Sequence, residues 1–365
     1  MARWRSEAGA PPPKRVRTVD DTLPADAAYR MAGEGVGLLW RSDFHNARQL
    51  LQALARRADR KPRRAAATSD SPIEAFHAHR LAQGQRSRLL GRLLIYLEAD
   101  YAITLPRAPD LRTACTEAWG PPDGQPSVAS LRELLGLVGA HEWRKKGVEI
   151  PALGGPPRNR IHAHYGVFSP VRGEYLDLVS TAPLPSRELA FDIGTGTGVL
   201  AAILARRGVQ RVIATDQDPR ALACARDNLA HLGLQDRIDV VQADLFPPGC
   251  APLVVCNPPW LPARPSSPLE HAIYDEDSRM LRGFLGGLAQ HLAPGGEGWL
   301  ILSDLAQHLG LRTPDALPSL IDASGLRVVG RQEVRPRHPK AGDAADPLHG
   351  ARAREVTSLW RLGVR

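Results

Sequence analysis

From residue 188 onward the chain alternates between short apolar runs and amphipathic segments, and this alternation restricts the possible folds more than any other feature. The expected strands are 188–193, 211–215, 237–242, 252–256 and 298–303. The expected helices between them are 198–208, 218–233 and 279–292. Asp218 followed by Pro219 is a typical helix start. Strands that alternate with helices predict an α/β domain with a parallel, doubly wound sheet.

The turn after the first strand reads DIGTGTG and is rich in glycine. Gly194, Gly196 and Gly198 let the backbone turn sharply and approach a bound cofactor closely. We expect this loop, including Thr195, to bind a cofactor. The dinucleotide fingerprint G-x-G-x-x-G needs glycine or alanine at position 199, where this chain has valine. This difference argues against a nicotinamide enzyme. Asp192 either contacts the cofactor or accepts hydrogen bonds from the backbone of its own loop.

Acidic residues follow the next two strands. Asp216 ends the second strand, where a carboxylate can accept hydrogen bonds from both hydroxyls of a ribose. Asp244 and Leu245 follow the third strand, near the place where an adenine amine would lie. The alternative interpretation is that each aspartate is a helix cap or a solvated loop residue.

The fourth strand ends in the turn NPPW, from Asn257 to Trp260. Proline has no amide hydrogen, so the strand must stop at Asn257. The turn holds an amide side chain, the carbonyl of Pro258 and an aromatic ring at the carboxyl end of a strand, where open α/β sheets bind ligands. Alternatively, the turn only ends the strand and Trp260 is a core residue.

Taken together, these motifs give residues 160–330 a resemblance to class I S-adenosylmethionine-dependent methyltransferases. The NPPW turn is similar to that of enzymes that methylate planar amide or exocyclic nitrogens. The segment YGVFSPVRGEYL, 165–176, resembles a segment of the HemK/PrmC-type protein-glutamine methyltransferases, with Arg172 and Glu174 in comparable places. Trp260 stands where that family usually has tyrosine.

The resemblance implies a Rossmann-like methyltransferase sheet that is mostly parallel, with an antiparallel strand near the C-terminus. It implies S-adenosylmethionine as the cofactor and no metal. The cofactor contacts that it implies are the glycine loop, the three aspartates named above, Leu245 and Asn257. The weaker substrate contacts that it implies are Phe168, Arg172 and Pro259.

The NPPW turn also indicates the chemistry. The side-chain oxygen of Asn257 can accept one hydrogen of a planar –NH2 group, and the carbonyl of Pro258 can accept the other. These contacts hold the nitrogen in line with the methyl group and strengthen as positive charge develops on it. Trp260 offers a flat face on which an amide or a base can stack. The acidic segment 274–277 could bind a substrate near the turn, but we expect it to be a solvated helix start.

The positive charge is concentrated in the N-terminal part. Residues 1–160 carry a net charge of +9, and residues 161–365 carry −1. Clustered positive charge attracts phosphate, so this part is a candidate for contact with RNA or the ribosome. The alternative is that its many arginines only solvate helices.

The N-terminal part is expected to be helical, as it is in the HemK/PrmC family. Leucines within 71–97 recur at helical spacing, after a serine and proline that are typical of a helix start. We therefore expect a flexible basic tail over 1–22, a helical substrate-recognition domain over 23–150, a Pro- and Gly-rich linker over 151–160, and the methyltransferase domain over 161–365.

Composition excludes several classes of protein. The four cysteines form no C-x-x-C pair, which argues against a disulfide framework or a zinc site, and no stretch is apolar enough for a membrane span. We expect a cytoplasmic enzyme whose acceptor is a glutamine side chain on a protein of the translation apparatus. One alternative acceptor is the exocyclic amine of an RNA or DNA base. An alternative from another class is an inactive, cofactor-binding module that binds RNA or assists assembly.

Overall fold

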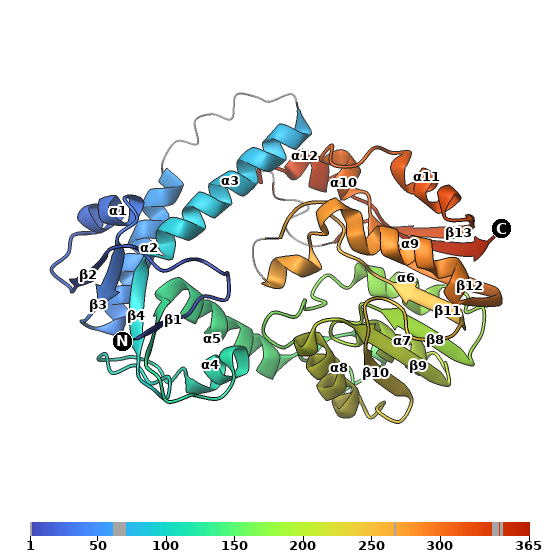
Figure 1. The fold of residues 1–365 in the computed structure, drawn as a ribbon, viewed down its shortest axis with the longest axis horizontal. Coiled ribbons are helices and arrows are strands. Elements are labelled where there is room, and N and C mark those ends of the chain that lie inside the picture. Colours follow the sequence, from blue (N-terminus) through green and yellow to red (C-terminus); the bar gives the residue numbers. More distant parts are fainter. Residues whose placement is uncertain (1, 61–70, 266–267, 338–342, 344–345) are drawn as a thin grey trace. The chain divides into compact units, whose positions relative to one another are not determined.

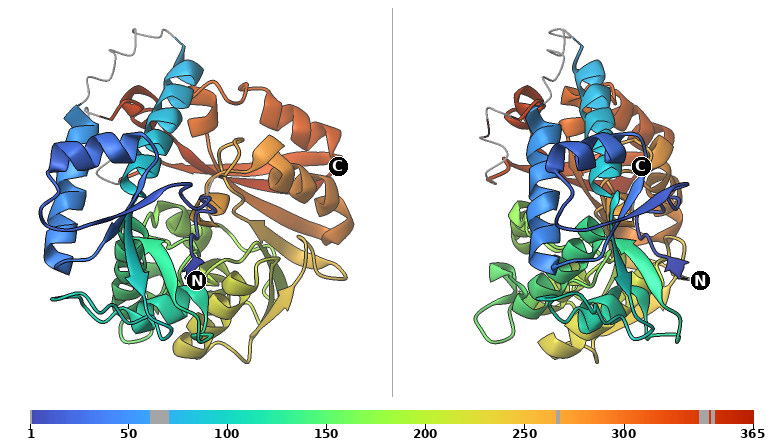
Figure 2. Two further views of the ribbon diagram at one scale, coloured as in Figure 1. Left: turned by 60° about the vertical axis from the view of Figure 1, so that its left-hand side comes forward. Right: turned by 90° about the vertical axis from the view of Figure 1, so that its left-hand side faces the viewer.

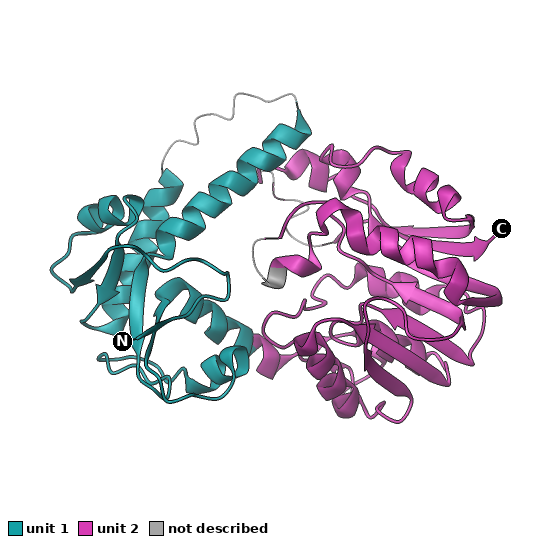
Figure 3. Cartoon of the chain, viewed as in Figure 1, with its two compact units in different colours: residues 1–142 teal, residues 143–365 magenta. Residues whose placement is uncertain are grey.

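The computed structural model divides into two compact units, residues 1–142 and residues 143–365 (Figure 3). The structure describes residues 2–60, 71–265, 268–337, 343 and 346–365. The division falls near the end of helix α5, Leu131–Lys146. The Pro- and Gly-rich segment expected to be a linker lies inside the second unit instead. There the one-turn helix η1, Pro151–Leu153, packs Leu153 into the core.

The first unit contains a five-stranded sheet as well as helices. Its elements before α5 are β1 (Arg3–Trp4), β2 (Val16–Val19), α1 (Ala25–Gly33), β3 (Gly37–Trp40), α2 (Phe44–Arg60), α3 (Pro72–Leu90), β4 (Leu93–Leu97), α4 (Arg112–Trp119) and β5 (Ser127–Ser130). The strand order is β1-β5-β4-β3-β2, in which only the β4–β5 pair is antiparallel. Helices α1, α2 and α3 pack on one another (Figure 2).

This sheet corrects the prediction of a helical N-terminal domain. The leucine spacing predicts helix throughout 71–97, but α3 ends at Leu90 and the following leucine-rich run forms the strand β4. Four of the five β4 side chains are almost completely buried, so apolar groups cover both faces of the strand. A short continuous apolar run has no period that distinguishes a buried strand from a buried helix. The pattern therefore predicted the wrong element here.

The expected flexible tail over 1–22 also differs from the structure. Its β1 pairs in parallel with β5, and its β2 pairs in parallel with β3. The guanidinium of Arg3 also donates hydrogen bonds to Asp123 and Gln125. Both strands are too short to show a period of two, and both lie at the edges of the sheet, where nearby prolines are tolerated. Neither could be recognised from the sequence pattern.

The second unit has the predicted doubly wound α/β architecture. Its strands are β6 (Val148–Glu149), β7 (Arg160–Ile161), β8 (Leu189–Ile193), β9 (Arg211–Asp216), β10 (Ile238–Gln242), β11 (Ala251–Cys256), β12 (Leu292–Ser303), β13 (Leu326–Val334) and β14 (Thr357–Val364). Its helices after η1 are α6 (Glu174–Thr181), α7 (Val199–Arg206), α8 (Pro219–Leu232), η2 (Pro268–Ala272), η3 (Glu276–Ser278), α9 (Arg279–His291), α10 (Leu305–His308), α11 (Ala316–Ala323) and α12 (His349–Arg352).

Seven of these strands form one sheet in the order β10-β9-β8-β11-β12-β14-β13 (Figure 1). The five strands from β10 to β12 are parallel, and β14 pairs antiparallel with both of its neighbours. This confirms the prediction of a mostly parallel sheet with an antiparallel strand near the C-terminus. The remaining strands, β6 and β7, pair with each other.

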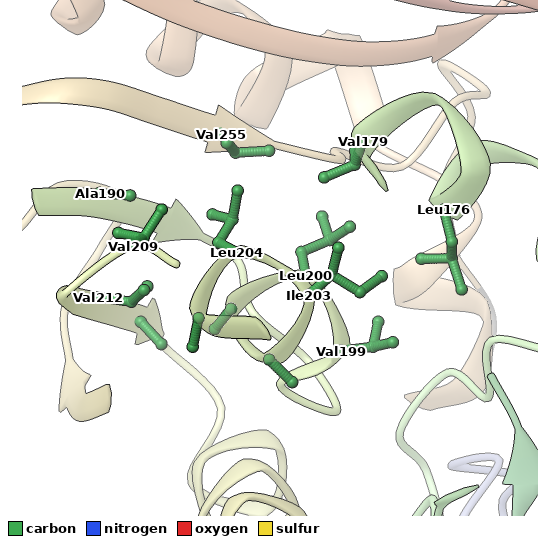
Figure 4. Packing of buried hydrophobic residues seen from close by; sticks show 14 of the residues in the cluster. Leu176, Val179, Ala190, Val199, Leu200, Ile203, Leu204, Val209, Val212 and Val255 are labelled. Atoms are coloured by element: carbon green, nitrogen blue, oxygen red, sulfur yellow. The ribbon is translucent and has the colours of Figure 1, made fainter. Parts of the chain in front are cut away.

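Hydrophobic cores cover both faces of the large sheet. Helices α6, α7 and α8 cover one face, and α9 and α11 cover the other. Figure 4 shows Leu204 of α7 close to Val255 of β11, and Leu200 of α7 close to Val179 of α6. Burial on both faces explains why the central strands β8 and β11 are almost continuous apolar runs in the sequence.

The chain reverses its direction of travel across the sheet between β8 and β11. From β8 the chain first adds β9 and β10 on one side and then returns to place β11 on the other side. Open α/β sheets bind their ligands at such a switch point, beyond the carboxyl ends of the strands. The glycine loop, Asp216, Asp244 and the NPPW turn lie at or just beyond the carboxyl ends of strands at this edge.

Candidate active site

The glycine loop follows β8 at the switch point. Gly194, Gly196 and Gly198 all have positive φ, of 71°, 55° and 81°. A Cβ on Gly194 would lie 2.4 Å from the Cε of Met280, so the loop and the start of α9 approach each other too closely for a side chain. A Cβ on Gly196 would meet no heavy atom within 4 Å. The backbone at Gly196 therefore borders open space, as a loop that lies against a cofactor must.

Asp192 holds the glycine loop in place through hydrogen bonds to its carboxylate. Its Oδ2 accepts hydrogen bonds from the Thr195 hydroxyl at 2.6 Å and from the Ala201 amide at 3.0 Å. The side chain is completely buried, and Oδ1 has no hydrogen-bond partner among the described residues. Burial raises the pKa of the Asp192 carboxyl to about 6. The sequence left two roles open for Asp192, contact with the cofactor or hydrogen bonding to its own loop. This geometry matches hydrogen bonding to the loop.

Asp216 joins two loops at the end of β9. Its Oδ2 accepts a hydrogen bond from the Gly196 amide and its Oδ1 accepts one from the Asp218 amide, both at 3.0 Å. Burial raises the pKa of the Asp216 carboxyl, and hydrogen bonds from the backbone oppose this shift. The side chain is part-exposed. It can therefore accept further hydrogen bonds from a ligand that lies on the glycine loop.

Asp244 and Leu245 follow β10. Asp244 forms an ion pair with Arg279, Oδ2 to Nη2 at 3.0 Å, and both side chains are largely exposed. Leu245 has a φ of 73°, and its carbonyl accepts a hydrogen bond from the Thr215 hydroxyl at 2.6 Å. This bond fixes the loop after β10 to the end of β9. The sequence pattern did not indicate the pairing with Arg279, because the two residues are 35 positions apart.

The NPPW turn places Asn257 beside the glycine loop. Cys256 of β11 pairs with Ile193 of β8, so the next residues along the two strands, Asn257 and Gly194, leave the sheet side by side. The side-chain oxygen of Asn257 accepts a hydrogen bond from Nε1 of Trp260 at 2.9 Å. This bond was not predicted, because a sequence shows which polar groups share a turn but not how they are oriented.

Trp260 is part-buried, and Pro258 is buried. The indole ring lies edge-on to the ring of Tyr175 in α6, with centroids 6.5 Å apart and an interplanar angle of 89°. It also packs against the core clusters on both faces of the sheet. Trp260 is therefore fixed on two sides, and Tyr175 is a site residue that the sequence analysis did not single out.

The residues assigned to substrate contact lie in two places. Phe168 and Pro259 are part-exposed, in the segment before α6 and in the NPPW turn. Burial lowers the pKa of the Arg172 guanidinium, and the nearby carboxylate of Glu355 opposes this shift. Glu355 is almost completely buried and accepts a hydrogen bond from the hydroxyl of Ser303, the last residue of β12. Arg172 thus lies toward β12 and β14 in the sheet order.

The acidic segment 274–277 directly precedes α9, as predicted, but Asp275 within it is buried and not solvated. The carboxylate of Asp275 accepts hydrogen bonds from the amides of Met280 and Leu281 at 3.0 to 3.2 Å. It therefore satisfies the free amides in the first turn of the helix. Among the described residues, no group of three or more potential ligands could hold a metal ion, and no helix is long and apolar enough to cross a bilayer.

The fold and the site together define a class. A glycine loop after the first strand, a carboxylate after the second, a loop acid after the third and an Asn-Pro-Pro turn after the fourth lie at one edge of a seven-stranded sheet. This arrangement is similar to that of class I S-adenosylmethionine-dependent methyltransferase domains. The open backbone at Gly196 and the part-exposed carboxylate of Asp216 fit that cofactor.

Residues 158–312 match the family model of the methyltransferase small domain. One relative is a release factor glutamine methyltransferase of Cereibacter sphaeroides, with 31% identity over 42% of this chain and 58% of the relative. A second is a tRNA1(Val) (adenine(37)-N6)-methyltransferase of Shewanella loihica, with 31% identity over 38% of this chain and 61% of the relative.

A third relative is a ribosomal protein L11 methyltransferase of Sorangium cellulosum, with 32% identity over 34% of this chain and 33% of the relative. The chain therefore spans less than two thirds of the length of each of these three relatives. Their names include both protein and RNA acceptors.

Proposed function

We propose that this protein transfers a methyl group from S-adenosylmethionine to the side-chain nitrogen of a glutamine in a protein of the translation apparatus. The observation that carries the proposal is the position of Asn257 at the end of β11. It lies directly beside the glycine loop, with its amide oxygen identified by the hydrogen bond from Trp260. A hydrogen-bond acceptor next to the cofactor loop is what a planar –NH2 group requires.

The glycine loop and Asp216 are assigned to cofactor binding. The carboxylate of Asp216 accepts hydrogen bonds from the ribose hydroxyls while it continues to hold the Gly196 amide. Asp244 accepts a hydrogen bond from the adenine amine, in competition with its exposed ion pair to Arg279. Such exposed pairs contribute little stability, so the competition is weak. S-adenosylmethionine would supply a methyl group on a sulfonium, from which a neutral thioether is a good leaving group.

Asn257 and Pro258 are assigned to the acceptor. The Asn257 Oδ1 accepts one hydrogen of the glutamine –NH2, and the Pro258 carbonyl accepts the other, so the nitrogen lone pair is directed at the methyl carbon. As the nitrogen–carbon bond forms, the electron pair of the carbon–sulfur bond would stay on the sulfur as a neutral thioether, and the proton released by the nitrogen would pass to solvent water. Both contacts strengthen as the nitrogen becomes positive, which lowers the barrier rather than only the free energy of binding.

Two observations support glutamine over a nucleobase. The segment before α6 is similar to the corresponding segment of the HemK/PrmC family. Trp260 is held edge-on to Tyr175 and hydrogen-bonded to Asn257, which limits its freedom to stack on an extruded base. The second candidate acceptor is the exocyclic amine of an RNA base. The net charge of +9 over residues 1–160 and the similarity to a tRNA adenine methyltransferase favour it.

The acceptor is tested by incubating the protein and radiolabelled S-adenosylmethionine with ribosomes, release factors and total RNA from a strain that lacks the protein. We expect label that survives nuclease and is removed by protease. Label in nucleosides would show that the acceptor is a base amine and not a glutamine side chain. Absence of transfer to every fraction, with the cofactor still bound, would support the inactive module instead.

The role of Asn257 is tested by Asn257→Ala. Because Asn257 positions the acceptor, this variant should keep its affinity for S-adenosylhomocysteine and lose about 100-fold or more in turnover, as when one transition-state contact is removed. Gln290→Ala removes an exposed amide from α9 in the same unit and serves as the matched control. Equal losses of cofactor affinity and turnover in a folded Asn257→Ala protein would show that the assignment is wrong.

A further inference from the structure

The hydrogen bond between Trp260 and Asn257 determines more than the shape of the turn. The indole Nε1 is only a donor, so the atom of Asn257 that faces it must be the amide oxygen. In most side-chain amides the oxygen and nitrogen are assigned from their surroundings. Here the surroundings allow one orientation, in which Nδ2 points away from the indole.

The indole itself cannot easily rotate away from this position. Its ring is edge-on to Tyr175, and the Tyr175 side chain is 5% exposed. The two prolines between Asn257 and Trp260 restrict the backbone that joins them. Asn257 is therefore oriented by a group that is held by the turn and by α6.

We propose that Trp260 is a positioning residue, whose indole N–H orients the Asn257 amide so that its oxygen accepts the acceptor –NH2. This inference rests on the proposed function. The amide oxygen has two acceptor positions, of which the indole occupies one and leaves one for the acceptor. If the amide were reversed, its own –NH2 would face the acceptor –NH2, and two donors would oppose each other. Trp260 thus selects the productive orientation.

This role differs from the stacking role that the NPPW motif suggests. A stacking residue acts through its ring face, whereas the positioning role requires the N–H group. Trp260→Phe keeps an aromatic ring and removes the N–H, and Trp260→Leu removes both. If Trp260 positions Asn257, both variants should lose turnover by a similar factor of about tenfold, the size expected for one hydrogen bond. Their KM for S-adenosylmethionine should stay unchanged.

A second measurement tests the geometry without any methyl transfer. The protein has seven tryptophans, and the indole N–H resonance of Trp260 is identified in a 15N-labelled sample by its absence from Trp260→Phe. Asn257→Ala should shift this resonance and speed its exchange with solvent. The indole N–H of Trp299, which donates to Glu297 at 3.0 Å, is the internal control and should not move.

The outcomes separate the inference from the function on which it rests. Turnover in Trp260→Phe within twofold of the wild type, with a large loss in Trp260→Leu, would overturn the positioning role in favour of stacking. An unchanged Trp260 resonance in Asn257→Ala would overturn it on geometry. If the wild type methylates no acceptor, the proposed function fails, and the resonance experiment still decides whether Trp260 orients Asn257. Thermal unfolding of each variant verifies that it is folded.

Discussion

Asp216→Asn tests the cofactor site most directly, because the replacement has the same shape as aspartate and lacks its charge. Asp216 uses one oxygen for the Gly196 amide and the other for the Asp218 amide. Asparagine offers one oxygen and one –NH2 group, so one of the two backbone amides will face a donor. The ribose hydroxyls will also lose a charged acceptor.

The expected magnitude follows from these contacts. A hydrogen bond to a charged group contributes about 1.5–3 kcal/mol, so the affinity for S-adenosylhomocysteine should fall by about 10- to 150-fold. The unmatched backbone amide should lower the free energy of unfolding by about 1–3 kcal/mol in the absence of ligand. Isothermal titration measures the first effect, and urea unfolding measures the second.

Asp218→Asn is the matched control. Asp218 is exposed and caps α8 by accepting a hydrogen bond from the Arg220 amide at 2.9 Å, and asparagine caps helices about as well as aspartate. This variant should bind S-adenosylhomocysteine with nearly the wild-type affinity. Burial raises the pKa of the Asp216 carboxyl, so wild-type affinity should decline on acidification at a higher pH than an ordinary carboxyl would cause. An Asp216→Asn affinity within about threefold of the wild type would refute the assignment of the ribose to Asp216.

Two further perturbations test the loop between these aspartates. The folded protein holds the Asp192 proton more tightly than the unfolded chain does, with a pKa of about 6, so this group stabilises the fold at low pH and loses that contribution as the pH rises through about 6. In urea unfolding, the free energy of unfolding of Asp192→Asn should therefore rise relative to that of the wild type as the pH increases from about 4 to about 7. A difference between the two proteins that does not change with pH would contradict the raised pKa of Asp192. Gly194→Ala should lower the free energy of unfolding by at least about 1–2 kcal/mol through its positive φ, and adding Met280→Ala should recover only the part due to the 2.4 Å contact. Full recovery in the double variant would show that the backbone conformation carries no cost.

The large sheet could be predicted because its strands repeat one signal. Strands β8 and β9 are short, mostly apolar runs that end in a glycine-containing or polar turn, and a helix follows each of them. The sheet of the first unit lacks this regularity, since β1 and β2 are very short and β4 continues the leucine pattern of α3. Tertiary packing decided the structure there, and local pattern did not.

The same distinction applies to the site. The positions of Asp192, Asp216 and Asn257 were predictable, because the carboxyl ends of parallel strands share one edge of a sheet. Their partners were not. The bond from Trp260 to Asn257 depends on side-chain orientation, and the proximity of Arg172 to Glu355 joins segments 183 positions apart. A single sequence contains no signal that brings such residues together.

The place of β14 in the large sheet has a consequence for synthesis on the ribosome. β14 follows the other six strands of this sheet in the sequence, yet it lies between β12 and β13 and pairs with both. Until it emerges, the neighbouring edge of β12 has no partner and β13 cannot join the sheet. Unpaired strand edges in a nascent chain invite association with other chains. Strands β8 to β11, which position the candidate site residues, are made earlier, so this part of the domain lies in the same sheet as an unpaired strand edge until β14 is inserted.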